Sequence, residues 1–255
     1  MRKSNKLPRL LARTFMAGLF CILSLSSFAA MANEKVESKT SNLKTEKINI
    51  QRKVPPYEIN CQFPVFIKDE SQADSEELEE LNKKTKKLVE ERVTESKNNF
   101  KDREYQKWQN SYLEIGYEVF EPNKQVICIV FALESFAAGA AHPIHWKESL
   151  VYDRKSKSFL KLSTVLNNSP RPLERVAEIC IKDLTGKKGL SDAEWIKEGA
   201  GPKAKNYKTF YLDKDGIGII FNEYQVGPYV SGAYYCKIPY SQLKSFLNPA
   251  LNLSN

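Results

Sequence analysis

The stretch from Gly216 to Leu243 places the strongest constraint on the fold of this 255-residue chain. It reads GIGIIFNEYQVGPYVSGAYYCKIPYSQL. The pattern predicts a strand, a turn at Gly227-Pro228, a second strand and the start of a helix at Pro239. It holds the densest apolar and aromatic content of the chain outside the N-terminus. We therefore expect it to form a closing hairpin and helix start, and it contains no recognisable catalytic group of residues.

The first 32 residues have the pattern of a signal peptide. A basic segment ends at Arg13, an apolar segment covers 14–28, and small residues at Ala30 and Ala32 predict cleavage after Ala32. The apolar segment has roughly 15 residues, which is short for a membrane span. An uncleaved N-terminal anchor is the alternative. Because no second apolar run of that length follows, we expect a periplasmic or secreted protein with no membrane span in the mature chain.

Most of the positive charge lies in this leader. The formal net charge is +8, and the five basic residues before residue 14 account for most of it, which leaves about +3 (8 − 5) on the mature chain. So small a charge does not favour binding to the phosphates of nucleic acid. We expect no nucleic-acid partner.

The cysteines predict disulfides. Removal of the leader takes Cys21 away and leaves Cys61, Cys128, Cys180 and Cys236. An even number of cysteines in an exported protein suggests two bridges, for which three pairings exist. We favour Cys61–Cys128 and Cys180–Cys236, because each pair then lies within one half of the chain. A zinc site is the alternative, but no CxxC spacing is present, and no metal site is predicted.

The order of predicted elements indicates an α+β fold, with a mainly antiparallel sheet, a long N-terminal helix and a second helical segment packed on it. Residues 33–53 are polar and charged and predict a flexible tether, 54–135 an N-terminal half, and 136–255 a C-terminal domain. No alternation of strand, helix and parallel strand is visible. Strands are expected at 57–67, 110–120, 124–135, 144–153, 207–212 and 216–224, with a last strand ending at Ile238. Helices are expected from Asp74 to about Asn98, from Pro172 to Leu184, after a cap at 191–194, and from Pro239 to Phe246.

Candidate chemistry is sparse. His142 and His145 have the spacing H-x-x-H, but Pro143 lies between them and a strand begins at Ile144. Positions three apart on a strand face opposite sides, so a shared metal is not expected. His142, at the end of a loop rich in Gly and Ala, is a candidate ligand contact or acid–base group. No G-x-S-x-G elbow or phosphate-binding loop is present, so no catalytic residue and no cofactor is assigned.

Tyrosines are the more informative set. Exposed tyrosines with polar neighbours suit sugar stacking or protein contacts, although alternation places about half of such residues in the core. With His142, the candidate binding residues are Tyr224, Tyr229 and Tyr235. The tyrosines and the phenylalanine that crowd the last third are Tyr207, Phe210, Tyr211, Tyr224, Tyr229, Tyr234, Tyr235 and Tyr240.

Four segments carry a family resemblance. FNEYQVGPYVSG at 221–232 and KIPYSQL at 237–243 resemble the sequence motifs of a bacterial extracytoplasmic family of unknown function. AGAAH at 138–142 resembles one of its loops, and FLKLS at 159–163 resembles another of its segments. The resemblance covers about residues 55–250. This family is found in the lysozyme-binding ectodomain of the RsiV anti-sigma factor and ahead of the catalytic domain of the peptidoglycan deacetylase PdaC.

The resemblance implies a non-catalytic binding protein of the cell envelope, because we recognise neither the transmembrane helix nor the deacetylase domain of those proteins in this sequence. Its expected partner is peptidoglycan or a lysozyme-like protein. The alternative is an envelope hydrolase acting on a cell-wall polymer with His142 as acid–base group. The matching segments look structural, so the resemblance assigns no role to a single residue.

Overall fold

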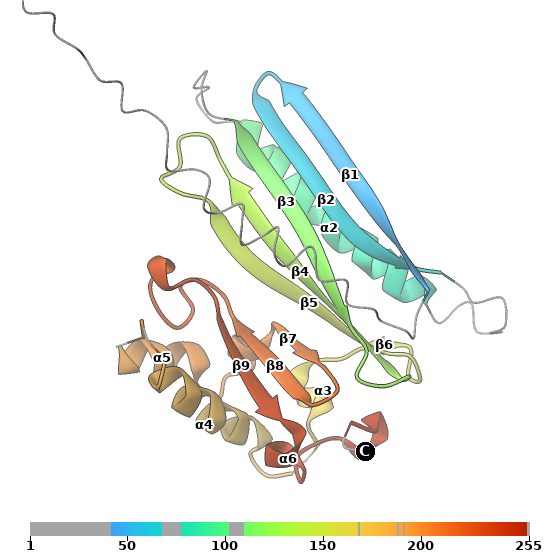
Figure 1. The fold of residues 1–255 in the computed structure, drawn as a ribbon, viewed down its shortest axis with the longest axis vertical. Helices are drawn as coiled ribbons and strands as arrows, with labels where there is room; N and C mark the ends of the chain where they lie inside the picture. The colour runs from blue at the N-terminus through green and yellow to red at the C-terminus, as the bar shows by residue number, and fades with distance from the viewer. Residues whose placement is uncertain are drawn as a thin grey trace, which may run out of the picture. The chain divides into compact units, whose positions relative to one another are not determined.

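The computed structural model describes residues 42–67, 78–101, 110–167, 169–187, 189–190 and 192–253. Figure 1 shows a large sheet with one long helix, and a smaller sheet with shorter helices. The strand order is β1-β2-β3-β4-β5-β6 in the large sheet and β7-β8-β9 in the small one. The predicted α+β class is therefore confirmed. The predicted leader, its cleavage site and the expected helix start at Asp74 lie outside the described residues.

The large sheet is mainly antiparallel. Only β2 and β3 pair in parallel among its described strands. Its strands are β1 (Leu43–Lys53), β2 (Pro56–Phe66), β3 (Ser111–Phe120), β4 (Val126–Phe136), β5 (Ile144–Asp153) and β6 (Ser158–Phe159).

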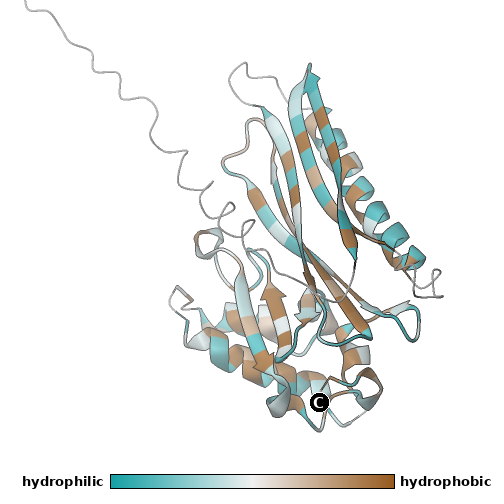
Figure 2. Cartoon of the chain, turned by 45° about the vertical axis from the view of Figure 1, so that its right-hand side comes forward, coloured by the Kyte–Doolittle hydropathy of each residue, from teal (hydrophilic) through white to brown (hydrophobic). Residues whose placement is uncertain are grey.

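Strand β1 corrects the predicted tether, because residues 43–53 pair with β2 along their whole length. Figure 2 shows hydrophobic and hydrophilic residues alternating along this strand. Ile48 and Ile50 are half-buried, and Asn49 and Gln51 between them are exposed. The charged composition hid this short alternation. Charged side chains are typical of an edge strand, where they discourage pairing with other chains.

Helix α2 (Glu79–Lys101) covers one face of the large sheet. It extends over most of the range predicted from Asp74 to Asn98, and it buries Leu81, Val89 and Phe100. Because α2 joins two parallel strands, β2, α2 and β3 form a β-α-β unit. The expectation that no such unit is present was wrong, since a single crossover leaves no repeating pattern in the sequence.

The small sheet consists of β7 (Phe210–Leu212), β8 (Gly216–Phe221) and β9 (Tyr234–Pro239), and all its pairs are antiparallel. β8 and β9 confirm the predicted closing hairpin. Their connection is not a tight Gly-Pro turn, however: residues 222–233 form a long loop with a short 3-10 helix, η2 (Tyr229–Ser231). The other elements are α3 (Leu162–Val165), α4 (Pro172–Thr185), α5 (Ala193–Ala200), α6 (Tyr240–Leu243) and the 3-10 helices η1 (Ala204–Tyr207) and η3 (Pro249–Leu251).

Strand β4 divides the interior into two apolar cores. Ile127 and Ile129 lie in the core beneath α2, and Val126 and Cys128 lie in the core shared with the small sheet and α4. The two sheets are joined where β7 meets β4 and β5. There the amide of Leu212 donates to the Cys128 sulfur at 3.3 Å. The boundary expected after residue 135 falls at the end of β4, and β5 continues the same sheet beyond it.

This division explains why one predicted disulfide does not form. All four described cysteines are buried free thiols. Cys61 lies in the core beneath α2 and Cys128 in the other core, so they project from opposite faces of the sheet and cannot approach disulfide distance. Cys180 of α4 and Cys236 of β9 are neighbours, and their side chains are hydrogen-bonded as thiols. The prediction of two disulfides is therefore corrected.

Of the helices that the structure describes, none combines the length and the apolar character needed to cross a bilayer.

Candidate functional site

Four aromatic side chains from separate parts of the chain lie near one another, and we call this group the aromatic run. Its members are Trp195 on α5, Tyr224 and Tyr229 in the loop after β8, and His142 in the loop before β5. The His142 and Tyr229 rings stack at 3.8 Å between centroids, and those of Tyr229 and Tyr224 lie 5.9 Å apart. The Trp195 indole Nε1 donates to the Tyr224 carbonyl at 3.1 Å. Tyr224 is 53% exposed, so the run presents aromatic surface to solvent.

The backbone at Tyr224 is unusual and is held in place by α5. Its φ angle is 64°, a left-handed conformation that is rare for a bulky residue. The next side chain, Gln225, donates to the carbonyls of Gly199 at 3.0 Å and Asn206 at 2.8 Å. Gly199 permits this close approach, because a Cβ there would lie 1.8 Å from the Gln225 carbonyl oxygen. The corner at Tyr224 is thus fixed by contacts that do not involve its own ring.

The same loop is fixed to β5 on its other side. The Glu223 carboxylate accepts hydrogen bonds from the His145 amide at 3.2 Å and approaches the ring Nδ1 at 3.0 Å. The amide side chain of Asn222 bonds both backbone groups of Lys147, at 2.8 and 3.0 Å. These two side chains satisfy the backbone of β5 as a neighbouring strand would. They also place a nearly buried carboxylate beside the exposed Tyr224.

A row of polar side chains crosses the large sheet next to the aromatic run. The strand register aligns Asn60, Glu114, Glu134 and His145 on β2 to β5. Asn60 donates to Glu114 at 2.9 Å, and the Tyr112 hydroxyl donates to Glu134 at 2.6 Å. The second Glu134 oxygen lies 3.6 Å from His145 Nε2. The row therefore offers carboxylate oxygens as acceptors.

Two side chains at this surface, one in the polar row and one in the aromatic run, have raised pKa values. Burial raises the pKa of the Glu114 carboxyl, and the nearby charges of Glu58 and Glu134 raise it further against the opposing bond from Asn60. Burial also raises the pKa of the Tyr229 phenol, with smaller contributions from neighbours that include Glu223. Tyr229 is therefore a neutral donor at neutral pH, and its hydroxyl donates to the Pro143 carbonyl at 3.0 Å.

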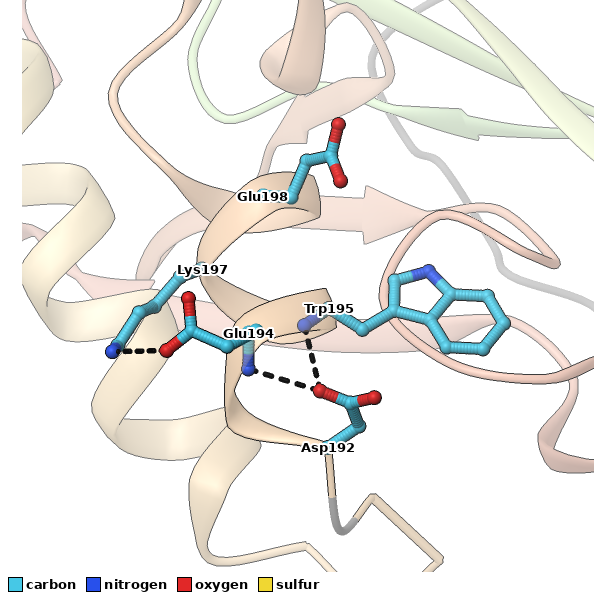
Figure 3. A pocket seen from close by; sticks show the side chains of 5 residues that line it. All are labelled: Asp192, Glu194, Trp195, Lys197 and Glu198. Atoms are coloured by element: carbon cyan, nitrogen blue, oxygen red, sulfur yellow. Dashed lines mark hydrogen bonds and ion pairs between the residues drawn. The ribbon is translucent and has the colours of Figure 1, made fainter.

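Helix α5 adds acidic groups at the other end of the run. Figure 3 shows Asp192, Glu194, Trp195, Lys197 and Glu198 around an open cavity of about 540 Å³. Asp192 caps the helix by accepting from the amides of Glu194 and Trp195, both at 3.0 Å, so the cap lies within the segment 191–194 where it was predicted. Lys197 pairs with Glu194 at 2.7 Å. The Trp195 ring extends away from this pair, toward the Tyr224 loop that its indole contacts.

The structure brings together three of the four predicted binding residues, His142, Tyr224 and Tyr229. Tyr235 lies elsewhere, on β9, where its ring centroid is 5.9 Å from the Lys147 Nζ. Sequence reasoning missed Trp195 and the His145–Glu223 pair as members of the site. The H-x-x-H spacing could have indicated that His145 belongs to the site. His142 lies in the loop before β5 and not on the strand, so the opposite-face argument does not apply, and both histidine rings approach Tyr229.

This arrangement favours binding over acid–base chemistry at His142. The His142 Nδ1 lies 2.8 Å from the Pro143 carbonyl, and its ring face is covered by Tyr229. Within the described part of the chain, no carboxylate is recorded as its partner. The described residues also contain no group of three or more His, Cys, Asp or Glu side chains placed to hold a metal ion.

The fold and the site define an α+β domain with an aromatic and acidic surface. Residues 164–241 match the family described as "Protein of unknown function (DUF3298)". This segment contains α4 to β9 and three members of the aromatic run. The predicted family resemblance is therefore confirmed, and the link to the RsiV ectodomain stays a prediction.

The chain is also similar to the peptidoglycan-N-acetylmuramic acid deacetylase PdaC of Bacillus subtilis (strain 168), with 26% identity over 238 residues. That match covers 91% of this chain and 47% of PdaC, so the chain spans about half the length of this curated relative. The remainder of PdaC has no counterpart in the match.

Two solved structures of the DUF3298 family share the fold. One, from Bacteroides fragilis, has a TM-score of 0.62 and 20% identity, and the match covers 84% of this chain and 97% of that one. The other, from Pseudomonas aeruginosa PAO1, has a TM-score of 0.55 and 17% identity, with 83% and 97% covered. At these identities the likeness concerns the fold alone.

Proposed function

We propose that this protein is an exported, non-catalytic binding protein of the cell envelope, and that the aromatic run binds cell-wall glycan. The observation that carries the proposal is the run itself. Trp195, Tyr224, Tyr229 and His142 come from three parts of the chain and meet at one surface. Aromatic faces pack against the apolar faces of ligands, while neighbouring carboxylates accept hydrogen bonds from hydroxyl and amide groups.

Support for the compartment and the polymer comes from two further features. The first 32 residues have the pattern of a signal peptide. The similarity to PdaC connects the chain to a protein named for its action on peptidoglycan. A binding module beside a peptidoglycan enzyme would hold the same polymer without changing it, and we place this chain in that role.

The test is retention of the purified mature protein on peptidoglycan sacculi. We expect the parent protein to be retained and Tyr224→Ala to be released. Tyr235→Ala is the matched control, because Tyr235 is also an exposed tyrosine, 41% against 53%, and lies outside the run. Equal retention of both variants would remove the aromatic run from the binding site. Loss of the parent protein in the wash would exclude peptidoglycan.

A lysozyme-like protein is the second candidate partner. The row containing Glu114 and Glu134, together with Glu223, gives the surface beside the run an acidic character that suits a basic partner. Immobilised lysozyme in parallel with sacculi separates the two candidates. Binding to a protein through this row would weaken steeply with rising salt, whereas stacking of a neutral glycan would not.

The hydrolase alternative has less support. The His142 ring is stacked on Tyr229, and its Nδ1 is occupied by the adjacent carbonyl. Release of soluble sugar from sacculi by the parent protein and not by His142→Ala would establish it. Unchanged sacculi in both cases would leave the binding proposal standing alone.

A further inference from the structure

A second cavity combines an apolar wall with a rim of lysines, and it shares no residue with the aromatic run. Its volume is about 740 Å³, within the range typical of small-molecule sites. The lining residues come from β5, the segment around α3, the start of α4, and η1 with the residues that lead into β7.

The wall of this cavity is apolar. Leu162, Leu166, Tyr207 and Phe210 belong to the core shared with the small sheet. The Tyr207 hydroxyl donates to the Ala200 carbonyl and is therefore already satisfied. Leu160 and Leu173 pack against this core and are only half-buried, so an alkyl chain that covers them gains free energy. The apolar side chains that line it are Leu160, Leu162, Leu166, Leu173, Tyr207 and Phe210.

The rim is positively charged. Lys161, Lys205 and Lys208 line the cavity and are exposed, and the lining contains no Asp or Glu. Among the described residues, no ion pair is recorded for these three ammonium groups. By contrast, Lys187 on α4 pairs with Asp183 at 2.9 Å. The rim therefore favours an anion.

The other polar side chains of the lining are mostly committed to the fold. Asn167 and Ser169 donate to the Ser245 carbonyl at 2.8 and 3.2 Å, and the Ser149 hydroxyl accepts from the Phe210 amide at 3.0 Å. A sugar, with a hydroxyl on most carbons, would leave many of its groups unpaired here. The cavity fits a ligand with one charged end and one apolar end.

We infer that this cavity binds a single-chain amphiphile with an anionic head, of the fatty-acid class. The alkyl chain lies on the leucine wall and the carboxylate on the lysine rim. The site is independent of the proposed glycan binding, because the two surfaces have no residue in common.

The test is calorimetric titration of the parent protein with dodecanoate below its micelle concentration. We expect dodecanoate to bind at one saturable site. Dodecanol, which has the same chain length and no charge, should bind at least about tenfold more weakly than dodecanoate. Dodecylamine should not bind. Rising salt should weaken the binding of dodecanoate to the parent protein, and this measurement needs no variant.

Two variants locate the ligand. Replacing Lys161, Lys205 and Lys208 together by Gln should weaken dodecanoate at least about tenfold and leave the melting temperature unchanged, since all three are exposed. Ala204→Trp should fill the cavity and weaken the binding of dodecanoate and of dodecanol alike. Tyr224→Gly should change the affinity for neither ligand. Equal affinity for dodecanoate and dodecanol, or unchanged affinity in the triple variant, would overturn the inference.

Discussion

Replacement of Tyr224 by Gly separates binding from folding more cleanly than any other substitution in the aromatic run. The residue has φ 64° and its ring is 53% exposed. The contacts that hold the corner are made by the Tyr224 carbonyl and by its neighbours Glu223 and Gln225. Glycine keeps these contacts and removes only the ring.

The expected magnitudes follow from this geometry. A left-handed backbone costs a residue with a Cβ about 1–2 kcal/mol, and Gly avoids that cost. Gly also increases the entropy of the unfolded chain, which costs about 0.5–1 kcal/mol. The free energy of unfolding of Tyr224→Gly should therefore lie within about 1 kcal/mol of the value for the parent protein. Tyr224→Ala keeps the unfavourable backbone and should be about 1 kcal/mol less stable than Tyr224→Gly.

The assay combines denaturant unfolding with binding to sacculi. Loss of a central aromatic contact costs about 2 kcal/mol or more, so both variants should bind about 30-fold more weakly. Two results would refute the reasoning. If Tyr224→Ala is the more stable variant, the left-handed backbone carries no strain; if Tyr224→Gly binds as the parent does, its ring is not a contact.

Three further substitutions or reactions test the fold around the site. Burial raises the pKa of the Glu114 carboxyl, so the folded state binds the carboxyl proton more tightly than the unfolded state, and stability falls as pH rises above the unfolded pKa. Glu114→Gln should therefore raise the melting temperature near pH 7. It should have no such effect near pH 3.5, where the carboxyl is protonated in both states. Gly199→Ala should lower the free energy of unfolding by about 3 kcal/mol, because its Cβ would overlap the Gln225 carbonyl oxygen. Burial raises the pKa values of Cys61 and Cys128 to about 12, so alkylation near pH 8 should be slow in the folded protein and rapid after unfolding without reductant.

Each of these has a matched control or a contrary result. Gly186→Ala should be close to neutral, since its Cβ would lie 3.6 Å from the nearest atom. An equal gain for Glu114→Gln at both pH values would show that packing, and not charge, is responsible. Unfolded, unreduced protein in which two of the four described cysteines resist labelling would contain a disulfide, contrary to the structure.

The sequence predicted the class of fold and the closing hairpin because local patterns determine them. Alternation defines β8 and β9, and an apolar stripe defines α2. It failed for β1, whose charges resemble those of a tether although alternate residues face the sheet. It also failed for Cys61 and Cys128. The face on which each thiol lies depends on strand register, which no local pattern records.

The site was predictable as residue types and not as a place. Tyr224, Tyr229 and His142 were candidates because tyrosines and a loop histidine suit binding. Their convergence depends on the long loop after β8 meeting the loop before β5. Trp195 was hidden for the same reason, since its position in a short helix says nothing of the Tyr224 carbonyl that its indole contacts.

The central claim, that the aromatic run binds cell-wall glycan, is tested most directly by the NMR signal of the Trp195 indole Nε1–H. This group bonds the Tyr224 carbonyl in the free protein, so a ligand on the run must change its surroundings. On titration with soluble glycan fragments of peptidoglycan, the account predicts a saturable shift of this signal, while the indole signal of Trp146, which donates to Glu148 at 2.9 Å, stays in place. Saturable binding of the same fragments with no change at Trp195 would contradict it.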